Sequence, residues 1–158
     1  MKTLYLVRHA DSPKNIKGIK DWERPISGKG IRISHEVFRT LKIAKPDRII
    51  SSYAFRALNT AFIMAHEIDY LFTKIQIEMT LYKHSAKSIR AFLTKQSNSL
   101  SSIMLVGHNP SLNRLYKLLT NESYELPKSS VITIRFNTNK WSELKIGAPI
   151  GKAIYAKQ

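Results

Sequence analysis

The sequence LYLVRHA at residues 4–10 sets the pattern of the chain, because four apolar residues in a row are followed at once by an arginine and a histidine. A short apolar run without alternation is typical of a strand that is buried on both faces of a sheet. The sequence IMLVGHN at residues 103–109 repeats this pattern, and RIIS at residues 48–51 is a shorter example. We therefore predict three buried, parallel strands with polar side chains just beyond their carboxyl ends.

A helical pattern follows each of these strands. Apolar residues at spacings of three and four predict helices around residues 31–41, 57–68 and 112–119, and a further helix around residues 89–93. Residues 75–77 are a candidate edge strand. Strands that alternate with helices favour a three-layer α/β/α sandwich around a mostly parallel central sheet.

The C-terminal part of the chain has a different pattern. Ile132, Ile134 and Phe136 alternate with polar residues, and a polar turn at residues 137–140 precedes further apolar positions at 141, 144 and 146. This pattern predicts a β-hairpin, so that the sheet closes with an antiparallel C-terminal edge. No linker, repeat or low-complexity segment interrupts the sequence, and we expect a single domain over residues 1–158.

The composition excludes several classes of protein. With 158 residues, 43% hydrophobic and 23% charged, the chain has the composition of a folded globular domain. It contains no cysteine, which excludes disulfides, thiolate zinc sites and cysteine nucleophiles. No apolar run reaches the roughly 18 to 20 residues of a membrane span, and the N-terminus meets a charge too early for a signal peptide. We expect a cytoplasmic protein that has no membrane partner.

The charge balance is strongly basic. Lys and Arg number 26 against 11 Asp and Glu, which gives a formal net charge of +15. Such an excess favours an anionic partner. The basic residues are scattered, and no zinc-finger or Gly-aromatic RNA-binding signature is present, so we expect no nucleic acid. The charge alone does not choose between a phosphorylated substrate and an acidic protein surface.

The ends of the predicted strands carry an unusual set of side chains. Arg8 and His9 follow the first strand, Arg56 follows the second, and His108 follows the strand at residues 103–106. Ligands of an open α/β sheet bind beyond the carboxyl ends of its strands. Two arginines and two histidines in one crevice form a cationic pocket that fits a phosphoryl group. A neutral imidazole can attack phosphorus in line, so this set suits the making and breaking of a P–N bond.

The sequence resembles the histidine phosphatase superfamily, also called phosphoglycerate mutase-like, and within it the small SixA-type phosphohistidine phosphatases. The matching motifs occur in order along nearly the whole chain. They are LVRHA at residues 6–10, RPISGKG at 24–30, SSYAFRALNTA at 51–61, LVGHNPSL at 105–112 and LP at 126–127. The resemblance implies a phosphoglycerate mutase-like fold and a phosphatase that hydrolyses phosphohistidine on a protein.

The resemblance also implies a role for each residue of the pocket. His9 would be the nucleophile that forms a covalent phosphohistidine intermediate, which water then hydrolyses. Arg8, Arg56 and His108 would bind the phosphoryl oxygens and stabilise their charge in both steps. Neither step needs a metal or a cofactor. The implied partner is a phosphorylated substrate, and an acidic protein domain that carries phosphohistidine would suit the basic chain.

One feature departs from the larger members of the family. Those that hydrolyse phosphate monoesters carry a Glu or Asp shortly after the third strand, whereas MTLYKHS at residues 79–85 has no carboxylate. Glu78 and Asp11 are the nearest substitutes for this general acid. An alkoxide leaves poorly without a proton donor, but the imidazole of phosphohistidine departs readily. The missing acid therefore favours phosphoramidate substrates.

Three other functions are compatible with parts of the pattern. A broader phosphomonoesterase would act on small phosphorylated compounds. A hydrolytic metal site would use His9, Asp11 and His108, but the adjacent Arg8 and Arg56 would repel a cation. A non-catalytic module that binds phosphoproteins would not require a nucleophile at His9.

Four further residues lie close to the motifs. Ser12 and Asn15 are candidates for the mouth of the pocket, and Arg24 either contacts the phosphoryl group or fixes the loop before Pro25. Asn109 is a candidate for the pocket through its amide, but we expect its side chain to open the predicted helix that follows.

Overall fold

Six strands form one sheet at the centre of the computed structural model, which describes residues 1–155. They are β1 (Lys2–Arg8), β2 (Arg48–Ser51), β3 (Gln76–Ile77), β4 (Ser102–Gly107), β5 (Val131–Phe136) and β6 (Ala148–Ala153). Their order in the sheet is β3-β2-β4-β1-β5-β6. Strands β1 to β4 pair in parallel, β5 pairs antiparallel with β1, and β6 pairs antiparallel with β5. The sheet is therefore mostly parallel with an antiparallel C-terminal edge, as predicted.

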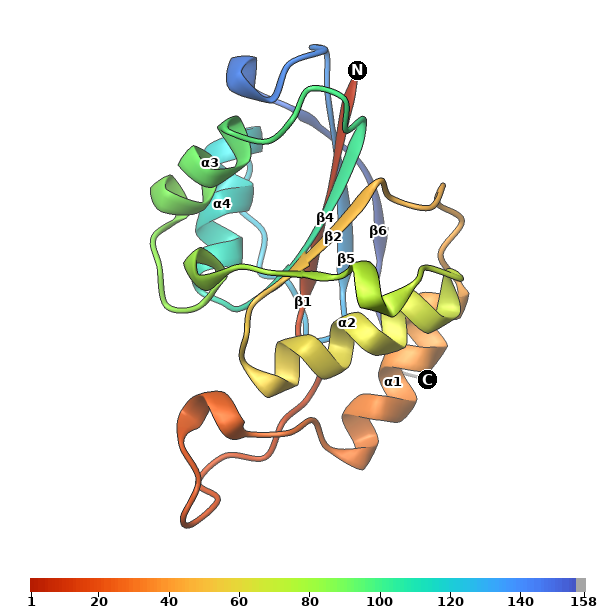
Figure 1. The fold of residues 1–158 in the computed structure, drawn as a ribbon, viewed down its shortest axis with the longest axis vertical. Helices are drawn as coiled ribbons and strands as arrows, with labels where there is room; N and C mark the ends of the chain where they lie inside the picture. Colours follow the sequence, from red (N-terminus) through yellow and green to blue (C-terminus); the bar gives the residue numbers. More distant parts are fainter. Residues whose placement is uncertain (156–158) are drawn as a thin grey trace.

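Helices cover both faces of this sheet (Figure 1). They are α1 (Gly28–Arg39), α2 (Phe55–Glu67), α3 (Ala86–Thr94) and α4 (Ser111–Thr120), with short 3-10 helices η1 (Asp21–Glu23), η2 (Phe72–Lys74), η3 (Met79–Leu81) and η4 (Trp141–Glu143). Helices α1 and α2 pack on one face, and α3 and α4 pack on the other. The predicted three-layer α/β/α sandwich is confirmed.

No helix within residues 1–155 is both long enough and apolar enough to cross a membrane. The single-domain prediction covers residues 1–158, of which 156–158 lie outside the described residues, and it stays a prediction.

Strand β1 shows why the central strands are apolar throughout. Leu4 and Leu6 join the cluster formed with α3 and α4, whereas Tyr5 and Val7 join the cluster formed with α1 and α2. Successive side chains of a strand point to opposite faces of the sheet. Because helices cover both faces, all four side chains are buried.

The chain just beyond β1 is held against the first turn of α1. Ser27 is the N-cap of α1, and its Oγ accepts a hydrogen bond from the Gly30 N–H at 3.0 Å. The Ser27 N–H in turn donates to the carbonyl oxygen of Asp11 at 2.8 Å. A Cβ at Gly30 would lie 2.5 Å from that same oxygen, so the approach requires glycine. This contact fixes the segment that follows Arg8 and His9.

The C-terminal hairpin differs from the prediction in the position of its second strand. Residues 141–146 do not pair with β5; Trp141 begins η4, and the strand that pairs with β5 starts at Ala148. The Trp141 indole is fully buried, and its N–H donates to the carbonyl oxygen of Leu100 at 2.8 Å. Tertiary packing of this large side chain therefore overrides the local alternation of apolar residues.

Candidate active site

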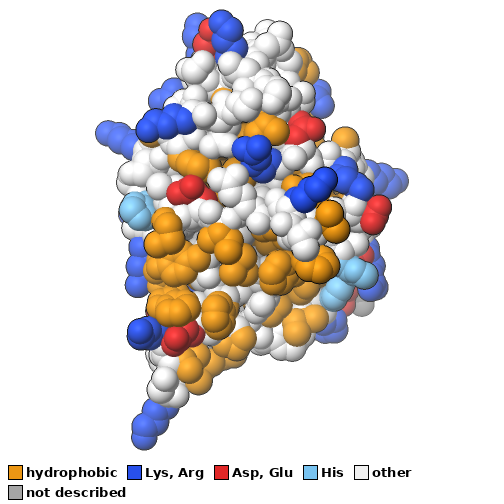
Figure 2. Space-filling model, in the orientation of Figure 1, with side chains coloured by type: hydrophobic (Ala, Val, Ile, Leu, Met, Phe, Trp, Pro, Cys, Tyr) orange, Lys and Arg blue, Asp and Glu red, His pale blue; other side chains and the backbone are white. Residues whose placement is uncertain are grey.

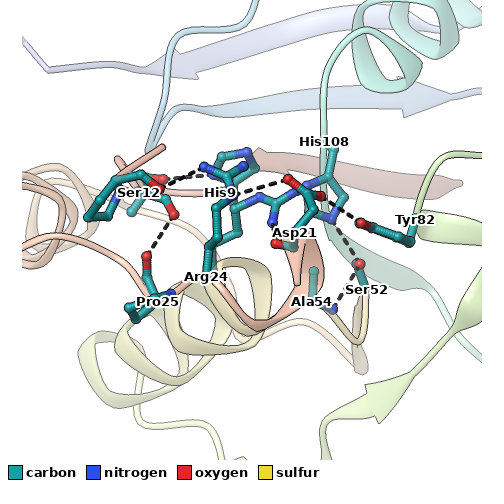
Figure 3. A network of polar contacts seen from close by, with 12 residues as sticks. His9, Ser12, Asp21, Arg24, Pro25, Ser52, Ala54, Tyr82 and His108 are labelled. Atoms are coloured by element: carbon teal, nitrogen blue, oxygen red, sulfur yellow. Dashed lines mark hydrogen bonds and ion pairs between the residues drawn. The ribbon is translucent and has the colours of Figure 1, made fainter. Parts of the chain in front are cut away.

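The predicted site residues lie at the carboxyl ends of three adjacent strands. Arg8 ends β1 and His9 follows it, His108 follows β4, and Arg56 lies in the first turn of α2, directly after β2. Strand β4 lies between β1 and β2, so these ends are neighbours. The ring centroids of His9 and His108 are 5.0 Å apart, and the charges of Arg8 and Arg56 act on His9. The structure therefore brings the four residues together, and Figure 3 shows the polar network around the two histidines.

His9 is held as a neutral imidazole with one free nitrogen. Its Nδ1 lies 2.7 Å from the carbonyl oxygen of Ala10 and donates to it, so Nε2 keeps its lone pair. Burial lowers the pKa of His9 to about 4, with the positive charges of Arg56 and Arg8 acting in the same direction. At neutral pH, Nε2 is available as a nucleophile.

His108 is also neutral, and Ser52 orients it. The Nε2 atom lies 2.8 Å from Ser52 Oγ. Burial, followed by the effects of His9 and Arg56, lowers the pKa of His108 to about 2. Its Nδ1 is buried and has no hydrogen-bond partner within the described residues.

The two arginines are anchored but each keeps an unpaired N–H. A terminal nitrogen of Arg8 donates to the carbonyl oxygen of Leu126 at 2.7 Å. Arg56 donates to the backbone oxygen of Asp21 at 2.7 Å and to its carboxylate at 3.0 Å. The Nε atoms of both arginines are buried without a partner in the part of the chain that the structure describes. Together with His108 Nδ1, these nitrogens provide unfilled positions for an anion with several oxygens.

Asp21 and Tyr82 belong to this network, although the sequence analysis did not single them out. The Tyr82 hydroxyl donates to the Asp21 carboxylate at 2.6 Å, and its ring stands edge-on to His108 at 5.4 Å between centroids. Burial alone would raise the pKa of Asp21. Hydrogen bonds from Tyr82 and Arg56 and the charges of Arg56 and Arg24 outweigh it and hold that pKa well below its usual range. Asp21 is therefore an ionised anchor for Arg56.

Both candidates for the general acid make local structural contacts. The Asp11 carboxylate binds Lys128 and accepts a hydrogen bond from Ser27 at 2.7 Å. These two hydrogen bonds lower the pKa of Asp11, so the group is ionised at neutral pH. Glu78 caps η3, because its side chain accepts from both the N–H and the hydroxyl of Thr80 at 2.9 Å.

The residues named around the motifs have mainly structural contacts. Ser12 Oγ donates to the carbonyl oxygen of Pro25 at 2.7 Å. Arg24 fixes the loop, because it donates to Asp21 at 3.0 Å and to the carbonyl oxygen of Pro13 at 2.9 Å.

The prediction that Asn109 opens the following helix is wrong. The N-cap of α4 is Pro110, and no side chain caps that helix. The Asn109 amide instead donates to the carbonyl oxygen of Leu126 at 3.1 Å, the same oxygen that anchors Arg8. Asn109 therefore helps to hold the acceptor of an arginine in the pocket.

The metal-site alternative lacks a third ligand. Within residues 1–155, no three His, Asp or Glu side chains gather closely enough to hold a metal ion. Although the rings of His9 and His108 are neighbours, Asp11 is occupied by Lys128 and Ser27.

Comparison with known families agrees with this geometry. The family model of the histidine phosphatase superfamily (branch 1) matches residues 4–83, which is more than half of the chain. The chain belongs to the histidine phosphatase superfamily. Its fold resembles the protein histidine phosphatase SixA complexed with tungstate, with a TM-score of 0.84, 17% identity and 96% coverage of both chains. A sequence identity this low shows that the two proteins share a fold, not that they share a substrate.

Two other proteins are similar to most of this chain. A structure described as a putative phosphohistidine phosphatase SixA from Nakamurella multipartitia has a TM-score of 0.85 at 18% identity and covers 99% of this chain and 97% of that one. An uncharacterized chloroplastic protein of Arabidopsis thaliana is 25% identical in an alignment of 152 positions that covers 90% of this chain and 70% of the relative.

The acid–base behaviour of His9 in this histidine phosphatase is directly testable. We expect its imidazole to titrate near pH 4 and not near the ordinary 6.5, because burial and the nearby cations disfavour the imidazolium. As pH falls below 6.5 the unfolded chain binds this proton first, so the free energy of unfolding decreases as pH falls from 6.5 towards 4. NMR titration of the histidine Cε1–H signals, assigned with His9→Ala, checks the value. A midpoint near 6.5 would contradict this account of the pocket.

Proposed function

We propose that the chain is a metal-independent phosphatase that hydrolyses phosphohistidine on a protein through a covalent phospho-His9 intermediate. Membership of the histidine phosphatase superfamily supports phosphatase activity. The observation that carries the choice of substrate is the state of the carboxylates: Asp11 and Asp21 have lowered pKa values and are bound to cations. A substrate that needs no carboxylic acid fits this pocket best.

In the first step, His9 Nε2 attacks the phosphorus of the substrate. The Nε2–P bond forms as the P–N bond of phosphohistidine breaks, and the electron pair goes to the leaving imidazole. When the other nitrogen of that ring carries a proton, the imidazole leaves as a neutral molecule without a proton from the protein. Arg8, Arg56 and His108 donate to the phosphoryl oxygens and stabilise their charge.

In the second step, a water molecule attacks the phosphorus of phospho-His9. The electron pair of the Nε2–P bond returns to His9, and the proton of the water goes to the released phosphate. His9 also leaves as a neutral imidazole, because Nδ1 keeps the proton that it donates to Ala10. Both steps therefore expel an imidazole, and neither requires a general acid.

The substrate choice is tested by comparing two phosphoryl donors in the presence of a chelator. Wild-type protein should release phosphate from a phosphohistidine-bearing protein with a kcat/KM well above that for an aryl phosphate. Preference for the aryl phosphate would favour the broader phosphomonoesterase. Binding of the phosphoprotein without turnover of either compound would favour the non-catalytic module.

Ser52 gives a second, more local test of this mechanism. Its Oγ accepts from the Ala54 N–H at 3.3 Å and lies 2.8 Å from His108 Nε2. We assign the Ser52 hydroxyl as the donor in the second contact, which places the His108 proton on Nδ1. We expect Ser52→Ala to lower kcat/KM by about tenfold, the equivalent of one buried hydrogen bond, and Ser52→Thr to restore most of it. The ¹⁵N shifts of His108 should report the loss of the Nδ1–H tautomer in Ser52→Ala. Unchanged shifts and rates would remove Ser52 from this role.

A further inference from the structure

A broad apolar surface beside the pocket has no role in the proposed phosphoryl transfer. Figure 2 shows hydrophobic side chains gathered over α2 and the segment that carries η2, β3 and η3. Soluble monomers rarely expose a large contiguous apolar patch without a function. We call this surface the apolar face; its exposed members are Phe55, Phe62, Leu71, Phe72, Ile77 and Met79, each 43 to 61% exposed.

Aromatic contacts connect the apolar face to the pocket without a break. The rings of His108 and Tyr82 are 5.4 Å apart, and those of Tyr82 and Tyr53 are 4.9 Å apart. Tyr53 lies 6.1 Å from Trp22, which meets Phe55 edge-on at 5.6 Å. The series begins at a buried histidine of the site and ends at an exposed side chain. The apolar face is therefore continuous with the mouth of the pocket.

Ile77 and Met79 extend this mouth on the side of β3. Ile77 pairs with Ser51, the residue before Ser52. The Tyr82 N–H donates to the carbonyl oxygen of Met79 at 3.1 Å. Ile77 therefore lies beside the strand that leads to Ser52, and Met79 lies in the turn that leads to Tyr82. Both Ser52 and Tyr82 contact His108.

Cations stand at the rim of the same mouth. The Lys20 ammonium lies 5.9 Å from the Trp22 ring, and the Lys83 ammonium lies 5.1 Å from the Tyr82 ring. Of the carboxylates of the same region, Asp21 is paired with two arginines, and Glu23 and Glu78 each accept a backbone N–H. The positive charges of these two lysines therefore complement a partner whose own apolar contact surface is bordered by carboxylates.

We propose that the apolar face is the docking surface for the protein that carries the phosphohistidine, a proposal that rests on the proposed function. A histidine side chain is short, so its phosphoryl group reaches His9 only when the backbone of its protein lies against the mouth. The partner then buries apolar side chains on Ile77 and Met79, and its carboxylates meet Lys20 and Lys83. An apolar centre with a charged rim is the usual arrangement of such an interface.

The face also offers a place for an anchoring side chain. Phe55 and Phe62 are seven residues apart on α2 and so lie on the same side of the helix. Phe62 meets the ring of Phe72 at 6.2 Å, and both line a groove that Ala65 and Leu71 complete on its apolar side. An apolar side chain of the partner fits this groove, beyond the mouth itself.

The proposal is tested with two substrates and two matched double variants. The substrates are a histidine phosphotransfer domain, phosphorylated with phosphoramidate, and free phosphohistidine. The variant Ile77→Ser/Met79→Ser removes side chains that are 55% and 61% exposed, and the control Ile146→Ser/Ile150→Ser removes side chains that are 54% and 45% exposed away from the pocket. We expect the first variant to lower kcat/KM for the domain by about tenfold or more, mainly through KM, and to leave free phosphohistidine unaffected. The control should change neither rate.

Each contrary result has its own meaning. No loss on the domain, or an equal loss on both substrates, overturns the docking proposal while phosphohistidine hydrolysis stands. Sedimentation of the wild type as a dimer that Ile77→Ser/Met79→Ser dissociates also overturns it, because a second copy of the chain then covers the face. If the wild type hydrolyses neither substrate, the proposed function itself fails.

Discussion

We expect His9→Ala to lower phosphate release by on the order of 10⁴-fold or more, the size of effect seen when a covalent nucleophile is removed. His9 Nε2 is the nitrogen to which the mechanism transfers the phosphoryl group. In the proposed mechanism His108 does not take its place, because its Nε2 is engaged by Ser52 and its Nδ1, which has no partner within the described residues, is assigned as a donor to the phosphoryl group. The assay is steady-state phosphate release with chelator present.

The control for His9→Ala is the stability of the variant. The His9 side chain bonds only to the adjacent Ala10 among the described residues, so its removal breaks no hydrogen bond between elements of the fold. Thermal unfolding should show a folded protein with a Tm at or above that of the wild type, since a partly buried, desolvated imidazole is lost. Turnover at the normal rate in this folded variant would refute the role of His9.

The second large effect is expected at Arg56. Arg56→Ala should lower kcat/KM by about 10² to 10³, because it removes a preorganised donor to the phosphoryl oxygens. Arg8→Ala and His108→Ala should each cost on the order of 10² for the same reason. Arg56→Ala should also destabilise the protein, since the buried guanidinium binds both the backbone oxygen and the carboxylate of Asp21.

A conservative variant separates binding of the substrate from anchoring of the loop. Arg56→Lys keeps the positive charge but replaces the planar guanidinium with a single ammonium group. The guanidinium binds Asp21 through two nitrogens and keeps Nε unpaired for the substrate, and one ammonium cannot do both. Compared with Arg56→Ala, Arg56→Lys should recover part of the lost stability and little of the lost kcat/KM. Arg56→Ala with near-wild-type kcat/KM would place this residue outside the catalytic pocket.

The central fold was predictable because its signals are local. An apolar run such as residues 4–7 indicates a strand covered on both faces. Because ligands bind beyond the carboxyl ends of such strands, the same runs point to His9 and His108. Trp141 shows where local patterning fails. Its spacing from Leu144 and Ile146 imitates a strand, but burial of the indole against Leu100 sets the path of the chain.

The missed part of the site depends on contacts between distant segments. Asp21 begins the short helix η1, and only folding brings it to Arg56 and Tyr82. The one available signal was its position three residues before Arg24, a spacing that lets the two side chains pair in a tight turn. Tyr82 lies in the segment of residues 79–85, and nothing in the local sequence indicates that its hydroxyl donates to Asp21. Asn109 was misassigned because its bond to Leu126 spans seventeen positions of sequence.

Direct detection of the phosphoenzyme tests the central claim most sharply. Wild-type protein is mixed with a phosphohistidine-bearing protein in the presence of a chelator, quenched within a turnover in base, where phosphohistidine is stable, and mapped by mass spectrometry. The mechanism predicts a phosphoryl group on His9 that forms and decays at rates compatible with turnover and is absent in His9→Ala. Continued phosphate release with no phosphoryl group on His9, or with the group on another residue, would contradict it.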